Sequence, residues 1–161
     1  MKNLLLIDDE PDLLVLMKKL LKKQGYLVSD AHGGREGLKI AREKHPDIIV
    51  LDAMMPDIDG WDVARELKSD PDTRDIPIVM LTVMSEPKYQ KMSFDYSGAD
   101  WHVPKPFEPD MLFSILSLAV EDRSVIEEKV EKAVKRDMRM KQVLQMINPK
   151  LLASKYDYLK D

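Results

Sequence analysis

Residues 48–60 read IIVLDAMMPDIDG. Four aliphatic residues lead directly into Asp52, and a segment of Pro, Asp and Gly follows it. The aliphatic run is typical of a strand that is buried on both faces of a sheet, and the Pro/Asp/Gly segment is typical of a loop. Open α/β sheets place their chemistry at the carboxyl ends of their strands, which is where this pattern puts Asp52.

The rest of the first 120 residues repeats this arrangement of short apolar runs and longer segments of helical period. The apolar runs are Leu4–Asp8, Leu27–Ala31, Ile48–Asp52, Ile78–Thr82 and Trp101–Val103. The segments expected to be helical are Pro11–Gln24, Arg35–Glu43, Trp61–Lys68, Lys88–Ser97 and Asp110–Val120. This alternation predicts βαβ units and a parallel sheet that helices cover on both faces.

Composition limits the class of protein. The 161 residues are 44% apolar and 34% charged, which indicates a soluble globular chain. No apolar stretch approaches the roughly 20 residues that a membrane span needs, and the first residues do not have the form of a signal peptide. The chain has no cysteine, which excludes disulfides and thiolate chemistry. We therefore expect a cytoplasmic protein that does not bind membranes.

The net charge of −4 is unevenly divided along the chain. Residues 121–161 carry 10 Lys or Arg and 8 Asp or Glu, a net +2, which leaves −6 on the first 120 residues. An acidic main domain is a poor nucleic-acid binder. Because the basic excess of the tail is slight, we expect no binding to nucleic acid.

A second acidic cluster, Asp8-Asp9-Glu10, follows the first apolar run. Carboxylates that lie close together need a cation to remain ionised, so the two acidic strand ends suggest a metal site. Glu10 is better interpreted as the residue that starts the next helix. Asp57, Asp59 and Gly60 are interpreted as turn formers that start the helix after them.

The pattern changes after Val120. Between Asp110 and Ile147 there is neither Gly nor Pro, and Asn148-Pro149 is expected to end any helix there. Apolar residues recur in steps of four and three, which resembles an imperfect heptad seam, at Ile126, Val130, Ala133, Met140, Leu144 and Ile147. However, Ser124–Glu127 has the form of a capping box, which would start a separate helix near Val125. One long helix and two helices both remain possible.

Three roles are open for this tail. It could pack on its own domain, form a homodimer through the seam, or dock to a separate partner. The last stretch, Lys150–Asp161 with Tyr156 and Tyr158, could be disordered or could bind a partner.

Residues 1 to about 120 resemble a response-regulator receiver domain of two-component signalling. Four elements carry the resemblance, each after an expected strand: Asp8-Asp9, Asp52, Thr82 and Lys105-Pro106, with Gly98-Ala99-Asp100 and Phe107 beside the last. The resemblance implies a doubly wound, flavodoxin-like parallel sheet of five strands in the order 2-1-3-4-5, with helices on both faces and a C-terminal helical tail. We expect a receiver domain over residues 1–121 and a helical extension over residues 122–161.

The resemblance also implies a role for each site residue. Asp52 would be the phosphoacceptor, and Asp9, Asp52 and the backbone carbonyl of Met54 would ligate Mg²⁺, with Asp8 acting through a water. Lys105 and the Thr82 hydroxyl would contact the phosphoryl oxygens. Such a site suits phosphoryl transfer, because cations and donors neutralise charge on the transferred group.

The switch aromatic of the family, three residues before the lysine, is His102 in this chain. Thr82 would move toward the phosphoryl group, and His102 would rotate inward into the vacated space. The alternative is that His102 is only a surface residue at the edge of a strand.

The expected function is therefore phosphoacceptance from a sensor histidine kinase or a histidine phosphotransfer protein, with output through contacts to an unknown downstream protein. The chain is not expected to be an enzyme. Position 54 is Met, so the second carboxylate of an Asp-x-Asp phosphatase is missing. The alternative is a scaffold protein with this fold that self-associates through its tail regardless of phosphorylation.

Overall fold

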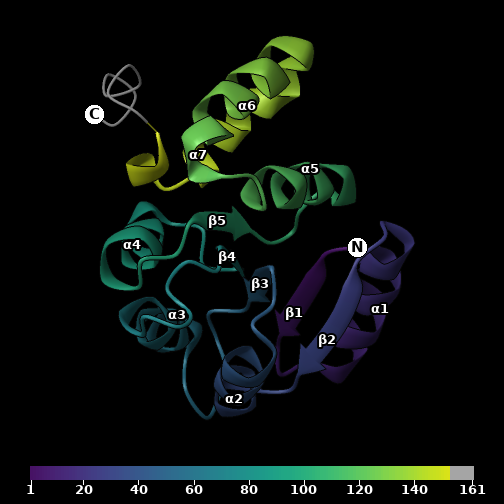
Figure 1. Cartoon of the computed structure of the whole chain (residues 1–161), viewed down its shortest axis with the longest axis vertical. Coiled ribbons are helices and arrows are strands. Elements are labelled where there is room, and N and C mark those ends of the chain that lie inside the picture. The colour runs from purple at the N-terminus through teal and green to yellow at the C-terminus, as the bar shows by residue number, and fades with distance from the viewer. Residues whose placement is uncertain (153–161) are drawn as a thin grey trace.

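The computed structural model describes residues 1–152, apart from the side chain of Arg123. Its centre is a five-stranded parallel sheet of order β2-β1-β3-β4-β5 (Figure 1), which confirms the predicted fold. The strands are β1 (Asn3–Ile7), β2 (Leu27–Ala31), β3 (Ile48–Leu51), β4 (Ile78–Thr82) and β5 (Trp101–Pro104).

Helices cover both faces of this sheet. One face packs against α1 (Pro11–Lys23) and α5 (Pro109–Ala119). The other packs against α2 (Gly34–Lys44) and α3 (Gly60–Ser69). The alternation of side chains along a strand explains the two cores: Leu4 and Leu6 of β1 face the first layer, and Leu5 and Ile7 face the second.

The segment between β4 and β5 differs from the single helix expected over residues 88–97. It consists of α4 (Pro87–Lys91) followed by a π-helical turn, η1 (Met92–Tyr96). Ser93 and Phe94, which are consecutive in this turn, are both buried. The wider π turn thus places two successive side chains inward, which hydrophobic periodicity does not reveal.

The tail forms several short elements, so the single long helix is wrong. They are α6 (Arg123–Arg136), η2 (Met138–Gln142), α7 (Val143–Met146) and η3 (Pro149–Leu151). The expected capping box is also wrong, because Asp122 caps α6 by accepting the Ser124 N–H at 2.9 Å. Asp137 ends α6 and caps the next turn by accepting the Arg139 N–H at 3.0 Å.

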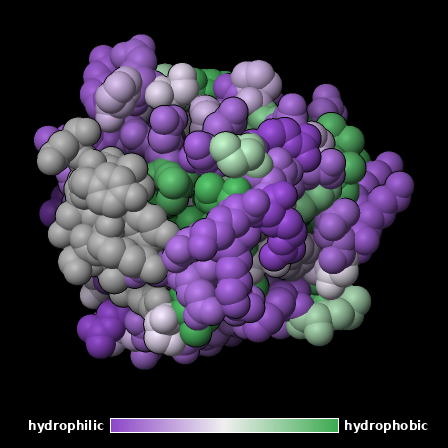
Figure 2. Space-filling model, turned by 90° about the horizontal axis from the view of Figure 1, so that it is seen from above, coloured by the Kyte–Doolittle hydropathy of each residue, from purple (hydrophilic) through white to green (hydrophobic). Residues whose placement is uncertain are grey.

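The tail packs on its own domain. The seam residues Ile126, Val130, Met140 and Ile147 are buried in one core with α5 and β5. Ile147 forms an antiparallel bridge with Trp101 at the edge of the sheet. Seen from the side of α6 (Figure 2), hydrophilic side chains predominate on the surface. The apolar residues of the seam therefore face inward, in the same chain.

Three expectations about the tail are not tested by this packing. The homodimer stays a prediction, as does the domain boundary between residues 121 and 122. Tyr156 and Tyr158 lie outside the described residues. Within residues 1–152, no helix combines the length and the apolar character that crossing a membrane requires.

Candidate functional site

The candidate site lies where the order of the strands reverses, between β1 and β3. Asp8 and Asp9 follow β1, and Asp52 follows β3. Each of the three offers a carboxylate oxygen within 4.8 Å of the others. Ligands of open α/β sheets bind at this kind of switch point. The structure therefore brings together the three carboxylates that the sequence singled out.

Backbone hydrogen bonds hold these residues in place. The N–H of Asp8 donates to the carbonyl of Ala31 at 3.1 Å, and the N–H of Asp52 donates to that of Ile7 at 3.0 Å. The Asp8 carboxylate also accepts the N–H of Glu10 at 2.9 Å. Glu10 is the N-cap residue of α1, as expected. Asp8 is thus tied both to the sheet and to the start of a helix.

The loop after Asp52 requires a glycine. A Cβ atom at Gly60 would lie 2.1 Å from the Asp52 carbonyl oxygen and 2.8 Å from the Cα of Ala53. Both contacts are to backbone, which cannot move aside as a side chain can. Gly60 therefore lets α3 begin close against the phosphoacceptor candidate.

The two aspartates before Gly60 have different roles. Asp59 caps α3 by accepting the Asp62 N–H at 2.8 Å, as expected. The expectation that Asp57 also starts α3 is wrong. Its carboxylate accepts the backbone N–H groups of Gly34 at 3.2 Å and Arg35 at 3.0 Å, at the start of α2. These bonds, that of Arg35 foremost, lower the pKa of Asp57.

Lys105 brings a cation to the carboxylates from β5. Its Nζ atom lies 3.3 Å from Asp8 Oδ2 and 3.9 Å from Asp52 Oδ1. The backbone N–H of Lys105 donates to the Thr82 carbonyl at 2.7 Å, which ties the loop after β5 to the end of β4. Among the described residues, Lys105 is the lysine paired with this cluster, which holds three carboxylates and so keeps an excess of negative charge.

The electrostatics of Asp52 reflect that excess. Burial raises its pKa to about 6, the Lys105 cation opposes the shift, and the Asp8 carboxylate adds to it. A divalent cation would offset both the cost of burying the ionised Asp52 carboxylate and its repulsion by the Asp8 carboxylate. The donors are hard carboxylate oxygens, which Mg²⁺ prefers. The residues present therefore fit Mg²⁺.

Thr82 and Met54 border this cluster. Thr82 is fully buried, and its hydroxyl oxygen accepts the Met84 N–H at 3.1 Å. The N–H of Met54 donates to Asp52 Oδ1 at 3.3 Å, and its side chain is half exposed. Met54 thus adjoins the carboxylate, while the ligand role of its carbonyl remains a prediction.

His102 is buried, so its interpretation as a surface residue is wrong. Its Nδ1 lies 2.7 Å from the Ser93 hydroxyl, and its Nε2 lies 3.0 Å from the Met84 carbonyl. The indole N–H of Trp61 donates to the same hydroxyl at 3.0 Å. The His102 ring therefore already points into the protein interior. Ser93 and Trp61 were missed because they lie on η1 and α3, respectively, and no local pattern links them to His102.

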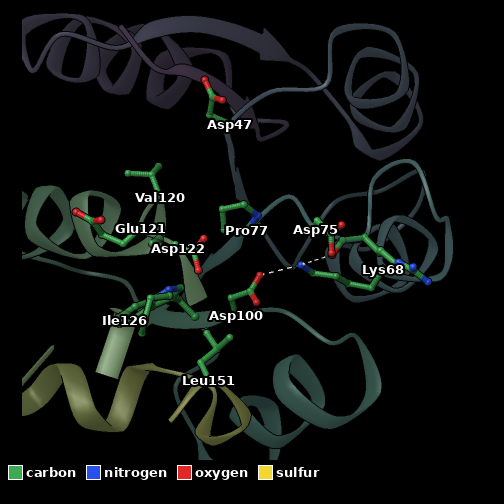
Figure 3. A pocket seen from close by; sticks show the side chains of 13 residues that line it. Asp47, Lys68, Asp75, Pro77, Asp100, Val120, Glu121, Asp122, Ile126 and Leu151 are labelled. Carbon is green, nitrogen blue, oxygen red and sulfur yellow. Dashed lines mark hydrogen bonds and ion pairs between the residues drawn. The ribbon is translucent and has the colours of Figure 1, made fainter. Parts of the chain in front are cut away.

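A cavity of about 400 Å³ lies away from this site, at the opposite ends of β4 and β5. Figure 3 shows Pro77 and Asp100, which precede these strands, with Leu151 of the tail on another side. Lys68 and Asp100 pair there at 2.9 Å, and Lys68 also donates to the Ile76 carbonyl at 2.8 Å. The lysine is thus engaged by the protein itself, and the cavity adds nothing to the carboxylate site.

The family model of the response regulator receiver domain matches residues 4–117. The DNA-binding dual master transcriptional regulator RpaA of Synechocystis is 38% identical over 114 residues, which are 71% of this chain and 47% of that protein. This chain spans about half the length of the curated relatives it matches.

Solved structures agree in fold. A putative response regulator from Chloroflexus aurantiacus has a TM-score of 0.70 at 29% identity, over 74% of this chain and 97% of that one. The response regulator TrrA from Thermotoga maritima, in complex with Mg²⁺ and BeF, has a TM-score of 0.66 at 34% identity, over 73% and 97%.

Proposed function

This chain belongs to the response regulator receiver domain family, and from that membership we propose that it accepts a phosphoryl group on Asp52. The donor would be the phosphohistidine of a sensor histidine kinase or of a histidine phosphotransfer protein. The observation that carries the proposal is the meeting of three carboxylates and Lys105 at one edge of the sheet. The neighbour that holds Mg²⁺ and BeF supports it.

The transfer exchanges one bond to phosphorus for another. A carboxylate oxygen of Asp52 attacks the phosphorus, the P–N bond to the donor histidine breaks, and an acyl phosphate forms. Lys105 neutralises the transferred oxygens, and the Thr82 hydroxyl donates to one of them. Asp9, Asp52 and the Met54 carbonyl, with Asp8 through a water, would hold Mg²⁺, which would supply further charge neutralisation.

We propose that the output is a contact with a downstream protein and that the chain is a phosphate carrier in the cytoplasm, without enzymatic turnover. RpaA is named as DNA-binding, but the family model ends at residue 117. The described residues that follow form a tail docked on the domain. The net charge of −6 on the first 120 residues supports a protein partner over DNA.

The test is intact-mass spectrometry of the full chain with acetyl phosphate and Mg²⁺. We expect a mass gain of one phosphoryl group that is lost on treatment with hydroxylamine. Asp52→Asn should abolish the gain. Asp59→Asn is the matched control, since Asn also caps helices well and Asp59 lies outside the cluster.

Two outcomes would overturn the proposal. One is no phosphoryl gain in the wild-type chain from acetyl phosphate or from phosphohistidine donors. The other is an undiminished gain in Asp52→Asn. The first would leave the scaffold alternative as the better account, in which the tail acts regardless of phosphorylation.

A further inference from the structure

A buried chain of hydrogen bonds leads from α3 to the end of β4. The indole N–H of Trp61 donates to the Ser93 hydroxyl at 3.0 Å, and that hydroxyl lies 2.7 Å from His102 Nδ1. On the other side of the ring, His102 Nε2 lies 3.0 Å from the Met84 carbonyl oxygen. Ser93 and His102 are buried, so water does not compete for these groups.

The direction of each bond follows from what each group can donate. A carbonyl only accepts, so the Met84 carbonyl requires a proton on His102 Nε2. In the neutral ring Nδ1 then accepts, so Ser93 must donate to it. The hydroxyl oxygen of Ser93 is left to accept from Trp61, whose indole only donates. Every polar atom is satisfied by a neutral imidazole, and burial, which lowers the pKa of His102, favours that form.

Met84 connects this chain to the phosphoacceptor site. Its carbonyl accepts from His102, and its N–H donates to the Thr82 hydroxyl oxygen at 3.1 Å. A hydroxyl that accepts one hydrogen bond keeps its own proton to donate. The carbonyl and the N–H of Met84 belong to different peptide units, so the link at this residue is the position of its backbone and not one continuous row of hydrogen bonds. By holding the Met84 carbonyl, His102 fixes the backbone whose N–H donates to Thr82.

We propose that Trp61 and Ser93 are positioning residues of the phosphoacceptor site. Through His102 and Met84, they orient the Thr82 hydroxyl so that its proton points to a phosphoryl oxygen. This inference rests on the proposed function of Asp52. Because the His102 ring is already held inward by Ser93, the ring needs no rotation for Thr82 to donate. The loop after β4 acts as a fixed support.

The test measures two affinities of the full chain, for Mg²⁺ alone and for beryllofluoride in saturating Mg²⁺. Ser93→Ala breaks the series of hydrogen bonds at its centre. Trp61→Phe removes the indole N–H together with one of the two fused rings and keeps one aromatic ring to stack on Tyr89. Both variants should bind beryllofluoride roughly fivefold to tenfold more weakly, the effect of about one hydrogen bond. The affinity for Mg²⁺ should not change, because the three carboxylates are untouched.

Ser97→Ala is the matched control. The Ser97 hydroxyl is also buried. It donates to the Ser93 carbonyl and takes no part in the series of hydrogen bonds that reaches Met84. We expect this variant to bind beryllofluoride like the wild type. Nitrogen NMR should show His102 protonated on Nε2 alone in the wild type and with a changed Nδ1 resonance in Ser93→Ala.

The outcomes separate the two proposals. Wild-type protein that binds neither beryllofluoride nor a phosphoryl group would overturn the proposed function and, with it, this inference. Wild-type binding with equal affinity in Ser93→Ala and Trp61→Phe would overturn this inference alone, as would an equal loss in Ser97→Ala. If Ser93→Ala fails to fold, Trp61→Phe decides the question.

Discussion

Asp52 lies in a cluster of three carboxylates with Lys105 beside it. Its pKa is raised to about 6, first by burial and then by the Asp8 carboxylate, against the opposing Lys105 cation. A carboxyl group with a raised pKa prefers its protonated form in the folded protein. It therefore favours folding at low pH, and that contribution is lost as the pH rises through about 4 to 6. Above this range, the ionised carboxylate costs stability.

Asp52→Asn should therefore stabilise the protein at pH 7 when no divalent cation is added. We expect a gain of about 1–2 kcal/mol in the free energy of unfolding, after allowance for partial screening by solvent. The gain should largely vanish at pH 4, where the side chain of residue 52 is neutral in both folded proteins. Urea unfolding at pH 4 and pH 7 would measure it.

Magnesium provides the control for this prediction. Saturating Mg²⁺ should stabilise the wild type more than Asp52→Asn, because binding to the folded state adds stability and the variant has lost a carboxylate ligand. Asp59→Asn should have the stability of the wild type, both with and without Mg²⁺. A variant less stable than the wild type at pH 7 would contradict the account of crowded carboxylates.

At the scale of elements, the tail closes the edge of the sheet. An edge strand leaves backbone groups unpaired, and proteins commonly cover it. Here the carbonyl of Asp100, just before β5, accepts the Asn148 N–H at 2.8 Å, and the Ala99 carbonyl accepts the Asn148 side chain at 3.0 Å. Ile147 is buried beside them. These contacts make residues 147–148 a cap on the edge of β5.

Ile147→Ala should weaken this cap. Truncating a buried Ile costs the transfer energy of the lost atoms and leaves a cavity, together about 2–5 kcal/mol. Met138→Ala is the control, since Met138 is 64% exposed and its truncation should stay within about 0.5 kcal/mol. Urea unfolding would compare the two. Equal effects would mean that the docking of Ile147 does not contribute to stability.

At the scale of the whole molecule, the burial of the seam limits self-association. Ile126, Val130 and Met140 are buried within their own chain, so a homodimer through them would first require the tail to undock. The outer side of α6 is mainly hydrophilic (Figure 2). For this reason we expect a monomer in solution as long as the tail stays docked.

Light scattering of the full chain should therefore give a monomeric mass in Mg²⁺, with and without beryllofluoride. A mass that doubles only with beryllofluoride would contradict this expectation and show that the phosphoryl mimic drives self-association. A dimer under both conditions would instead point to a constitutive interface, on a surface other than the buried seam.

Much of this architecture could be predicted from sequence because its signals are local. A strand buried on both faces is mainly aliphatic, and so the limits of β4 were predicted to the residue. A carboxylate at the end of such a strand must lie at the carboxyl edge of a parallel sheet, which brought Asp8, Asp9 and Asp52 together. In these cases the chemistry of the residue and its place in the element are enough.

The remaining features depend on contacts between distant segments, which only the tertiary structure decides. Asp57 caps α2 and not α3 because folding brings its loop against Gly34 and Arg35. The seam of the tail could bury itself against any apolar surface, and the nearest one is α5 and β5 of its own domain. His102 contacts the Ser93 hydroxyl because the π turn of η1 points Ser93 inward. Apolar patterning states that a residue is buried, but the packing of the chain selects its partner.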